Sequence, residues 1–173
     1  IFSDEYLKNE IRSLILSRSS KILCGLSWLT TNPSNFFKRN LDIVKFFQFL
    51  PRDKFSFINL QYGVSNEDLI ELRNNYGIEI YNFSQINLFQ NIDAQAALID
   101  ACDIVVSIAN SVAHLSSSLN KNTKVILPKV CDWRWGLNGN KSFWYKNTKL
   151  YRQKDFSDWD YVFKKISDDL KKL

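Results

Sequence analysis

The sequence predicts an α/β fold built on one doubly wound, mostly parallel sheet. Short apolar runs alternate with helix-like segments along the chain, which is the pattern of β–α–β units. Several of these runs are continuously apolar, as expected for strands that helices cover on both faces. With 173 residues and 45% hydrophobic content, the chain can bury one substantial core. We therefore expect a single Rossmann-like domain with six strands.

The first residues are predicted to form a helix that precedes this domain. The segment IFSDEYLKNEIRSLILSR has helical character, and the chain begins with Ile1 rather than Met. We expect residues 1–20 to be a linker helix that follows an upstream part of a longer protein. Residues 21–173 are expected to form the domain.

The first half of the domain is predicted to contain three strands and two helices. In chain order these are a strand at 22–28, a turn cluster at 32–35, a helix at 41–50, a strand at 55–61, a helix at 66–75 and a strand at 78–82. Pro51 ends the first helix. Ser65 and Asp68 predict a capping box for the second helix, and Gly77 is its expected stop.

The second half continues the alternation and then changes character. It is predicted to contain a helix at 94–102, a strand at 104–109, a helix at 112–119, strands at 123–128 and 150–153, and a helix at 158–173 that Ser157 caps. Between the last two strands, residues 131–136 and 142–145 crowd aromatic rings into a loop. That loop either forms a wall for a base or sugar or covers the sheet edge, which is the commoner use of tryptophan.

Charge and hydropathy argue against two classes of partner. The net charge is +5, but the basic residues are scattered and partly answered by acids. No basic stripe is interleaved with stacking aromatic residues, so nucleic-acid binding is not expected. No run approaches the roughly 18 to 20 apolar residues that span a bilayer, and these 173 residues contain no charged-then-apolar signal-peptide pattern, which leaves open a targeting segment upstream. We expect a soluble protein without a membrane span.

The three cysteines predict a reducing compartment. Cys24, Cys102 and Cys131 are an odd number without CxxC spacing, and two of them lie in apolar surroundings. They are interpreted as reduced structural thiols, which favours the cytoplasm. A metal site made of cysteines and the single histidine is not expected.

Candidate binding residues follow the predicted strands. In doubly wound sheets, ligands bind outside the carboxyl ends of the strands, where the strand order reverses. The candidates by this rule are Ser27, Trp28, Gln61, Asn110, Ser111, Val112, His114, Asp132 and Trp133. Arg39 is added because an arginine in a loop can contact a phosphate, although such residues are usually only exposed. The residues that follow the strands should all face one crevice.

The junction of the strand at 104–109 and the following helix carries the sharpest hypothesis. Residues 110–113 would present free backbone N–H groups and a positive helix end to a phosphate, and Ser111 adds a hydroxyl. The alternative is that Asn110 or Ser111 is only an N-cap, and the two interpretations are compatible. His114 either donates to an anionic ligand or is a satisfied core histidine, and we rank binding above catalysis for it.

Two common nucleotide motifs are absent. No GxGxxG follows the first predicted strand, and no GxxxxGK[ST] occurs. Dinucleotide-dependent oxidoreductases and phosphate-loop NTPases therefore lack their best evidence. No cofactor is expected, and no catalytic residue can be named.

The order of motifs resembles a known family of transferases. The series is GLSW, LQYG, DAQAALIDACDIVVSIANSVAHLSSSLNKNTKVILP, DWRWG and FWY. It resembles the C-terminal half of bacterial glycosyltransferases that often follow tetratricopeptide repeats and are related to the heptosyltransferase and O-GlcNAc transferase families. The similarity covers nearly all of residues 22–173 and is most specific in residues 93–128.

The resemblance implies one half of a GT-B fold, in which this half binds a nucleotide-diphosphate sugar without a metal. Such families commonly have an acid, then Thr or Ser, then a His three residues on. Ser111 and His114 match these positions, and Asn110 replaces the acid. The resemblance also places Trp28 and residue 32 near the domain cleft, Gln61 near the base or ribose, and Asp132 and Trp133 near the donor. It places Arg39 where relatives have a basic residue.

Two further expectations follow from the resemblance, and two alternatives stay open. An acceptor protein or glycan would be bound by an N-terminal domain outside this chain, and hexosyl or heptosyl transfer would need both domains. The isolated domain should therefore be inactive. The first alternative, favoured by Asn110, is a non-catalytic binding or assembly module that retains the fold. The second is an unrelated Rossmann-like domain for another phosphorylated metabolite.

Overall fold

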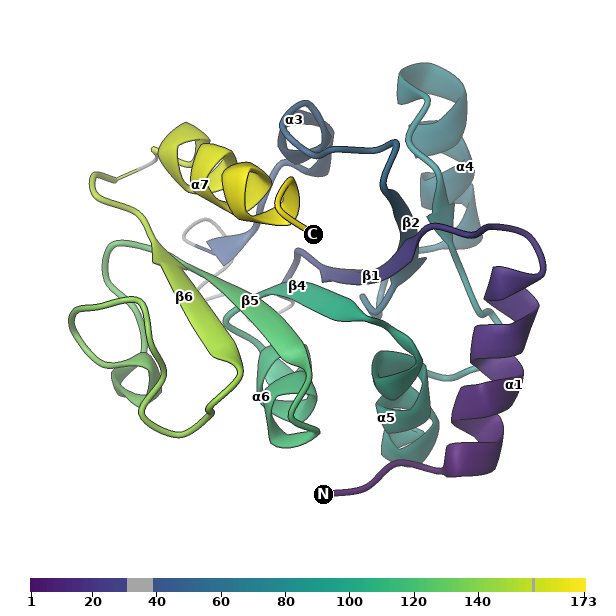
Figure 1. The fold of residues 1–173 in the computed structure, drawn as a ribbon. Coiled ribbons are helices and arrows are strands. Elements are labelled where there is room, and N and C mark those ends of the chain that lie inside the picture. Colours follow the sequence, from purple (N-terminus) through teal and green to yellow (C-terminus); the bar gives the residue numbers. More distant parts are fainter. Residues whose placement is uncertain (31–38, 157) are drawn as a thin grey trace.

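A computed structural model of the chain describes residues 1–30, 39–156 and 158–173 (Figure 1). The described residues form one six-stranded sheet in the order β3-β2-β1-β4-β5-β6, and every neighbouring pair is parallel. The strands are β1 (Ile22–Ser27), β2 (Phe55–Asn59), β3 (Ile80–Tyr81), β4 (Ile104–Ile108), β5 (Asn122–Leu127) and β6 (Thr148–Arg152). The predicted α/β, doubly wound fold is confirmed.

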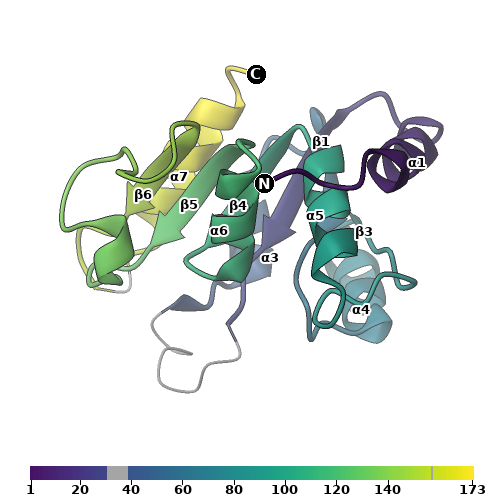
Figure 2. The same ribbon diagram turned by 90° about the horizontal axis from the view of Figure 1, so that it is seen from below.

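Helices cover both faces of this sheet (Figures 1 and 2). They are α1 (Glu5–Leu16), α3 (Ile43–Phe47), α4 (Asn66–Tyr76), α5 (Ile92–Ala101), α6 (Ser111–Ser118) and α7 (Asp160–Leu170), with a short 3₁₀ turn, η2 (Trp133–Trp135). α3, α4 and α7 contribute to the apolar cluster on one face, and α1, α5 and α6 to the cluster on the other. No helix in the described ranges is long and apolar enough to cross a membrane.

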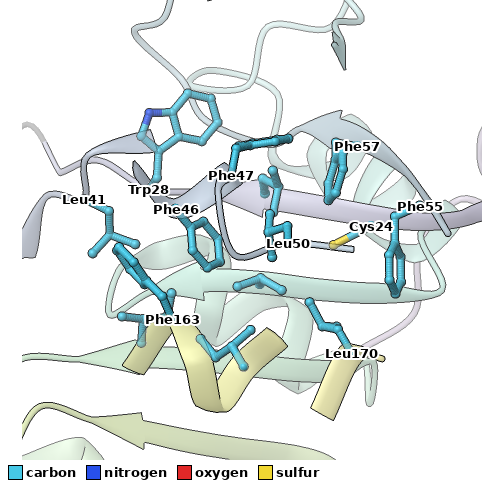
Figure 3. Close-up of a cluster of buried hydrophobic side chains, with 14 of the residues drawn as sticks. Cys24, Trp28, Leu41, Phe46, Phe47, Leu50, Phe55, Phe57, Phe163 and Leu170 are labelled. Carbon is cyan, nitrogen blue, oxygen red and sulfur yellow. The ribbon is translucent and has the colours of Figure 1, made fainter. Parts of the chain in front are cut away.

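The larger cluster is rich in aromatic side chains (Figure 3). Phe46 and Phe47 of α3 meet Phe163 and Phe57, with ring centroids 4.8 and 4.7 Å apart, respectively. Edge and tilted ring contacts of this kind add to the free energy gained by burying the rings. Although α3 is only five residues long, these rings anchor it firmly on the sheet.

The predicted helix caps can be compared directly with the structure. Ser65 and Asp68 form the expected capping box, and Gly77 ends α4 with a φ of 62°. The predicted cap Ser157 lies outside the described residues. The last helix begins at Asp160 rather than residue 158, and the Asp158 carboxylate accepts the backbone N–H of Tyr161 at 3.3 Å.

The N-terminal helix α1 packs against the domain. Ile11 and Ile15 are buried in the cluster that contains α5. Arg12 donates to the carbonyl of Ala101 and to Asp103, both at 2.7 Å. The segment predicted as a linker therefore belongs to the helical layer on this face of the sheet.

The cysteines agree with their predicted structural character. Cys24 and Cys102 are buried and free, and Cys131 is free and partly exposed. Burial raises the pKa of the Cys24 thiol and raises that of Cys102 to about 12, which keeps both protonated. Neither buried thiol is a reactive group.

Candidate functional site

The strand order reverses between β1 and β4, and this point organises the candidate site. β1 is followed along the chain by β2 on one side, whereas β4 and β5 extend the sheet on the other side. Crevices outside the carboxyl ends of strands at such a reversal are the usual ligand sites of doubly wound sheets. Ser27 ends β1, and Asn110 follows β4. The two residues lie together there, with Asn110 Nδ2 2.7 Å from Ser27 Oγ.

A buried network of amides and hydroxyls joins three strand ends. Gln61 is 1% exposed, and its Oε1 accepts from Ser27 Oγ at 2.9 Å and from the backbone N–H groups of Trp28 and Leu29. Ser27 in turn accepts from Asn110. The structure therefore brings Ser27, Gln61 and Asn110 together, and Gln61 holds the backbone of Trp28 and Leu29 directly after β1. Their contact with a ligand stays a prediction.

The start of α6 is capped, which corrects one expectation. Asn110 Oδ1 accepts the backbone N–H groups of Val112 at 3.0 Å and Ala113 at 3.3 Å. The N–H of Asn110 donates to Ile108. The prediction that these three N–H groups are free is wrong, because an asparagine at the N-cap satisfies the helix start locally. Ser111, the first residue of α6, is exposed at the same helix end.

His114 is held in a defined orientation by two aromatic residues. Its ring stacks on Trp135 with centroids 4.6 Å apart and an interplanar angle of 23°. Its Nδ1 lies 3.0 Å from the hydroxyl of Tyr145. If the hydroxyl donates to Nδ1, the neutral imidazole carries its proton on Nε2, which is then a donor. Partial burial, with Arg134 as the second cause, holds the pKa of His114 below its ordinary value, so this neutral form is favoured.

Charged residues lie around this histidine. Arg39 Nη1 donates to the carbonyl of Ala109 at 3.2 Å, which places the guanidinium at the carboxyl end of β4. Asp132 pairs with Arg134 at 2.9 Å. The backbone N–H of Arg134 is the main cause that lowers the pKa of Asp132, and Arg39 contributes through its charge. The structure thus brings Arg39, His114 and Asp132 into one region. No three His, Cys, Asp or Glu side chains gather as a metal site in the part of the chain described here.

The two tryptophans among the predicted site residues have opposite surroundings. Trp28 is 4% exposed and packs in the aromatic cluster with Phe46 and Leu41 (Figure 3). The expectation that its side chain faces the crevice is therefore wrong, because the core on the α3 and α7 face takes the ring. Trp133 is 70% exposed, and the Arg134 guanidinium lies over it at 4.8 Å.

The aromatic loop after β5 both covers the sheet and exposes rings. Trp135 is 1% exposed and packs with Leu127 and Leu150, so it serves as cover. Phe143 and Trp144 are 83% and 63% exposed, and Trp144 Nε1 donates to the carbonyl of Arg134. Tyr145 was predicted only as one of these loop rings. Its contact with His114 spans 31 positions and has no local sequence signal.

An uncharged groove lies beside this region, at the carboxyl ends of β2 and β3. It has a volume of about 460 Å³, and its lining includes Gln61 together with the amides of Asn59, Asn66 and Asn82. Asn82 joins the amides, since it accepts from Asn59 at 2.9 Å and donates to Asn66 at 2.6 Å. Of the residues that line this groove, only Gln61 was predicted from the sequence. The sequence signal that was missed is a pair of amides at the ends of two neighbouring strands, Asn59 at the end of β2 and Asn82 after β3.

The single histidine gives a direct test of this geometry. We expect its imidazole to titrate below pH 6.5 in the free protein, because burial and Arg134 disfavour the cation. A folded-state pKa below the unfolded value means that the stability provided by neutral His114 is present above about pH 6.5 and is lost as the pH falls. The Hε1 resonance of the one histidine, followed by NMR from pH 4.5 to 8.5, measures the midpoint. A midpoint at or above 6.5 would contradict this arrangement.

The chain is similar to known proteins in sequence and in fold. The sequence matches no protein-family model. It is similar to protein FlbA of Caulobacter vibrioides, with 24% identity over 112 residues, which are 64% of this chain and 18% of FlbA.

Two solved structures share the fold. One is ADP-heptose LPS heptosyltransferase II of E. coli, with a TM-score of 0.66, 15% identity, and coverage of 99% of this chain and 53% of that one. The other is a glycosyl transferase of family 9 from Veillonella parvula DSM 2008, with a TM-score of 0.60, 13% identity, and coverage of 100% and 46%. The chain therefore spans about half the length of the solved structures it matches and under a fifth of FlbA. It has the fold of a glycosyltransferase domain.

Proposed function

We propose that this chain is the domain of a glycosyltransferase that binds a nucleotide-diphosphate sugar donor. The observation that carries the proposal is that Arg39 donates to the carbonyl of Ala109, at the carboxyl end of β4 and next to the start of α6. Ser111 begins that helix, and His114 lies one turn into it, where Trp135 and Tyr145 orient the ring. The glycosyltransferase fold supports it, because one matched structure is named for a sugar nucleotide, ADP-heptose.

The diphosphate would lie at the start of α6. There the Arg39 guanidinium, the Ser111 hydroxyl and the Nε2–H of His114 supply donors, and the helix end adds positive potential. The Asn110 cap leaves fewer backbone N–H groups than an open helix start offers. Side-chain donors would therefore carry more of the phosphate recognition. Charge neutralisation by these groups is the basis on which we propose a metal-independent enzyme.

The nucleoside would lie in the uncharged groove beside β2 and β3. Its amides can hydrogen-bond a base or ribose, and the ring pair Tyr62 and Phe89, with centroids 5.4 Å apart, offers an aromatic surface. Gln61 joins the two regions, since it lines the groove and also contacts Ser27.

We propose that the acceptor, a protein or glycan, is bound by a further domain outside this chain. We also propose a bacterial, cytoplasmic enzyme of the type associated with tetratricopeptide repeats.

Nucleoside diphosphate binding tests this proposal. We expect ADP, GDP, UDP or CDP to bind in calorimetric titrations, and Arg39→Ala and His114→Ala each to weaken binding about tenfold, the loss of one charge-assisted hydrogen bond. Arg73→Ala, an exposed arginine on α4, is the matched control and should bind as the unmodified chain does. Absence of binding at millimolar concentration, with His114→Ala indistinguishable, would refute the proposal.

A second candidate function is a non-catalytic binding module with the same fold. It is favoured by the absence, in the described ranges, of a carboxylate hydrogen-bonded to His114, because a general base usually needs such a partner. Donor hydrolysis or transfer, assayed in the longest protein that carries this chain, separates the two functions. Robust turnover excludes the binding module.

A further inference from the structure

A second groove lies on the other side of the molecule, between β6 and α7. It has a volume of about 560 Å³, within the range of small-molecule sites. One wall is formed by residues 149–154 and the other by the exposed side of α7, and Gly139 and Asn140 close one margin. β6 is the edge strand of the sheet, and the lining of this groove contains none of the residues assigned to the proposed donor site.

The charges in the groove are unevenly distributed along its length. The helix α7 lies antiparallel to β6. Lys149, at the start of the strand, pairs with Asp169, near the end of the helix. At that end, Lys172 also contacts Asp169 at 3.4 Å, and Asp168 lies beside it in the lining. Two lysines are therefore matched by two aspartates, and this end is close to neutral.

At the other end the lining contains two lysines and no acid, and the nearby Asp158 carboxylate accepts the backbone N–H of Tyr161. Lys154 and Lys165 lie over the ring of Tyr161, with their Nζ atoms 4.4 and 4.7 Å from its centroid. Among the described residues, neither ammonium forms an ion pair. Hydrogen bonding by Lys165, the largest cause, and by Lys154 lowers the pKa of Tyr161, which places both ammoniums near the phenol oxygen.

The remaining cation in the lining is already engaged. Arg152 donates to the carbonyls of Gly139 and Trp135 and to Cys131 Sγ, so its guanidinium ties the loop after β5 to the edge strand. Among the described residues, Lys154 and Lys165 are thus the two lysines of the lining that contact Tyr161 and pair with no acid. Two ammonium groups beside one hydroxyl favour a ligand with two negative charges, such as a phosphate monoester. A single carboxylate carries only one negative charge.

We propose that this end of the β6–α7 groove binds the phosphate group of a small soluble phosphate ester. Lys154 and Lys165 contact the phosphate, Tyr161 donates its hydroxyl, and the groove along β6 holds the organic part. The inference is independent of the proposed donor site, because the two sites share no residue.

Phosphate titrations followed by NMR test this site residue by residue. We expect glycerol 3-phosphate and inorganic phosphate to cause saturable shifts of the backbone amides of Lys154, Tyr161 and Lys165. Lys154→Gln/Lys165→Gln should weaken the binding at least about tenfold. Lys164→Gln removes the same charge from an exposed neighbour on α7 that does not line the groove, and it should bind as the unmodified chain does.

Three outcomes would overturn the proposal. One is an equal shift with sodium chloride at the same ionic strength. The second is equal phosphate affinity in the double variant, whose fold is verified by its amide spectrum. The third is co-sedimentation with phosphatidic acid vesicles without any shift from glycerol 3-phosphate, which would assign the lysines to a lipid headgroup instead.

Discussion

Replacing Trp135 with alanine is expected to lower the free energy of unfolding by about 3–5 kcal/mol, the usual cost of removing a large buried aromatic side chain. Trp135 is 1% exposed and packs against Ala113 of α6, Val125 of β5 and Leu150 of β6. Its removal leaves a cavity at the point where the loop after β5 meets the sheet. Urea denaturation monitored by circular dichroism measures the loss.

The same substitution should release His114. The indole ring stacks on the imidazole and shields it from water, so without it the pKa of His114 should rise toward its ordinary value. The histidine Hε1 titration reports this change. Trp135→Phe keeps a ring in the same position and is expected to preserve most of the low pKa, which covers the case that Trp135→Ala does not fold.

Trp133→Ala is the matched control, because Trp133 belongs to the same 3₁₀ turn and is 70% exposed. It loses an exposed contact with Arg134 and should cost at most about 1 kcal/mol. Similar losses for the two variants would show that Trp135 does not support the site as described.

The sequence was sufficient to predict the sheet, because its strands are buried on both faces. β1, β2 and β4 have fully or almost fully buried side chains, and their largely apolar sequences reflect this burial. The strand ends were less predictable. The strand expected at 78–82 is reduced to Ile80–Tyr81, because β3 is an edge strand and pairs with β2 at only two positions. Pairing is set by the neighbouring strand, which local sequence does not encode.

The site was predictable where it depends on chain position and not where it depends on side-chain direction. Asn110 was expected at the helix start, as a cap or as part of a phosphate site, and it is the cap. Trp28 follows β1 as predicted, but its ring turns into the aromatic core rather than the crevice. Tyr145 reaches His114 across 31 positions, and only the folded loop reveals that pairing.

Asn110→Ala is the second large effect and should lower the free energy of unfolding by about 1.5–5 kcal/mol. Loss of an N-cap side chain costs about 0.5–2 kcal/mol. Loss of the Nδ2 donor to Ser27 leaves a buried hydroxyl with one partner fewer, which adds roughly 1–3 kcal/mol. Thermal or urea unfolding of the variant and the unmodified chain measures the difference.

Asn110→Asp separates the contribution of the accepting Oδ1 from that of the donating Nδ2. A carboxylate still accepts the N–H groups of Val112 and Ala113, and its charge suits the helix start. It cannot donate to Ser27 Oγ or to the carbonyl of Leu29, so the network that reaches Gln61 is weakened. We therefore expect a stability between those of the unmodified chain and Asn110→Ala. If the aspartate variant matched the unmodified chain, the cap alone would account for Asn110. If it matched the alanine variant, the donor to Ser27 would be the dominant interaction. The order of the three proteins in free energy of unfolding thus assigns the role of this residue at the point where the strand order reverses.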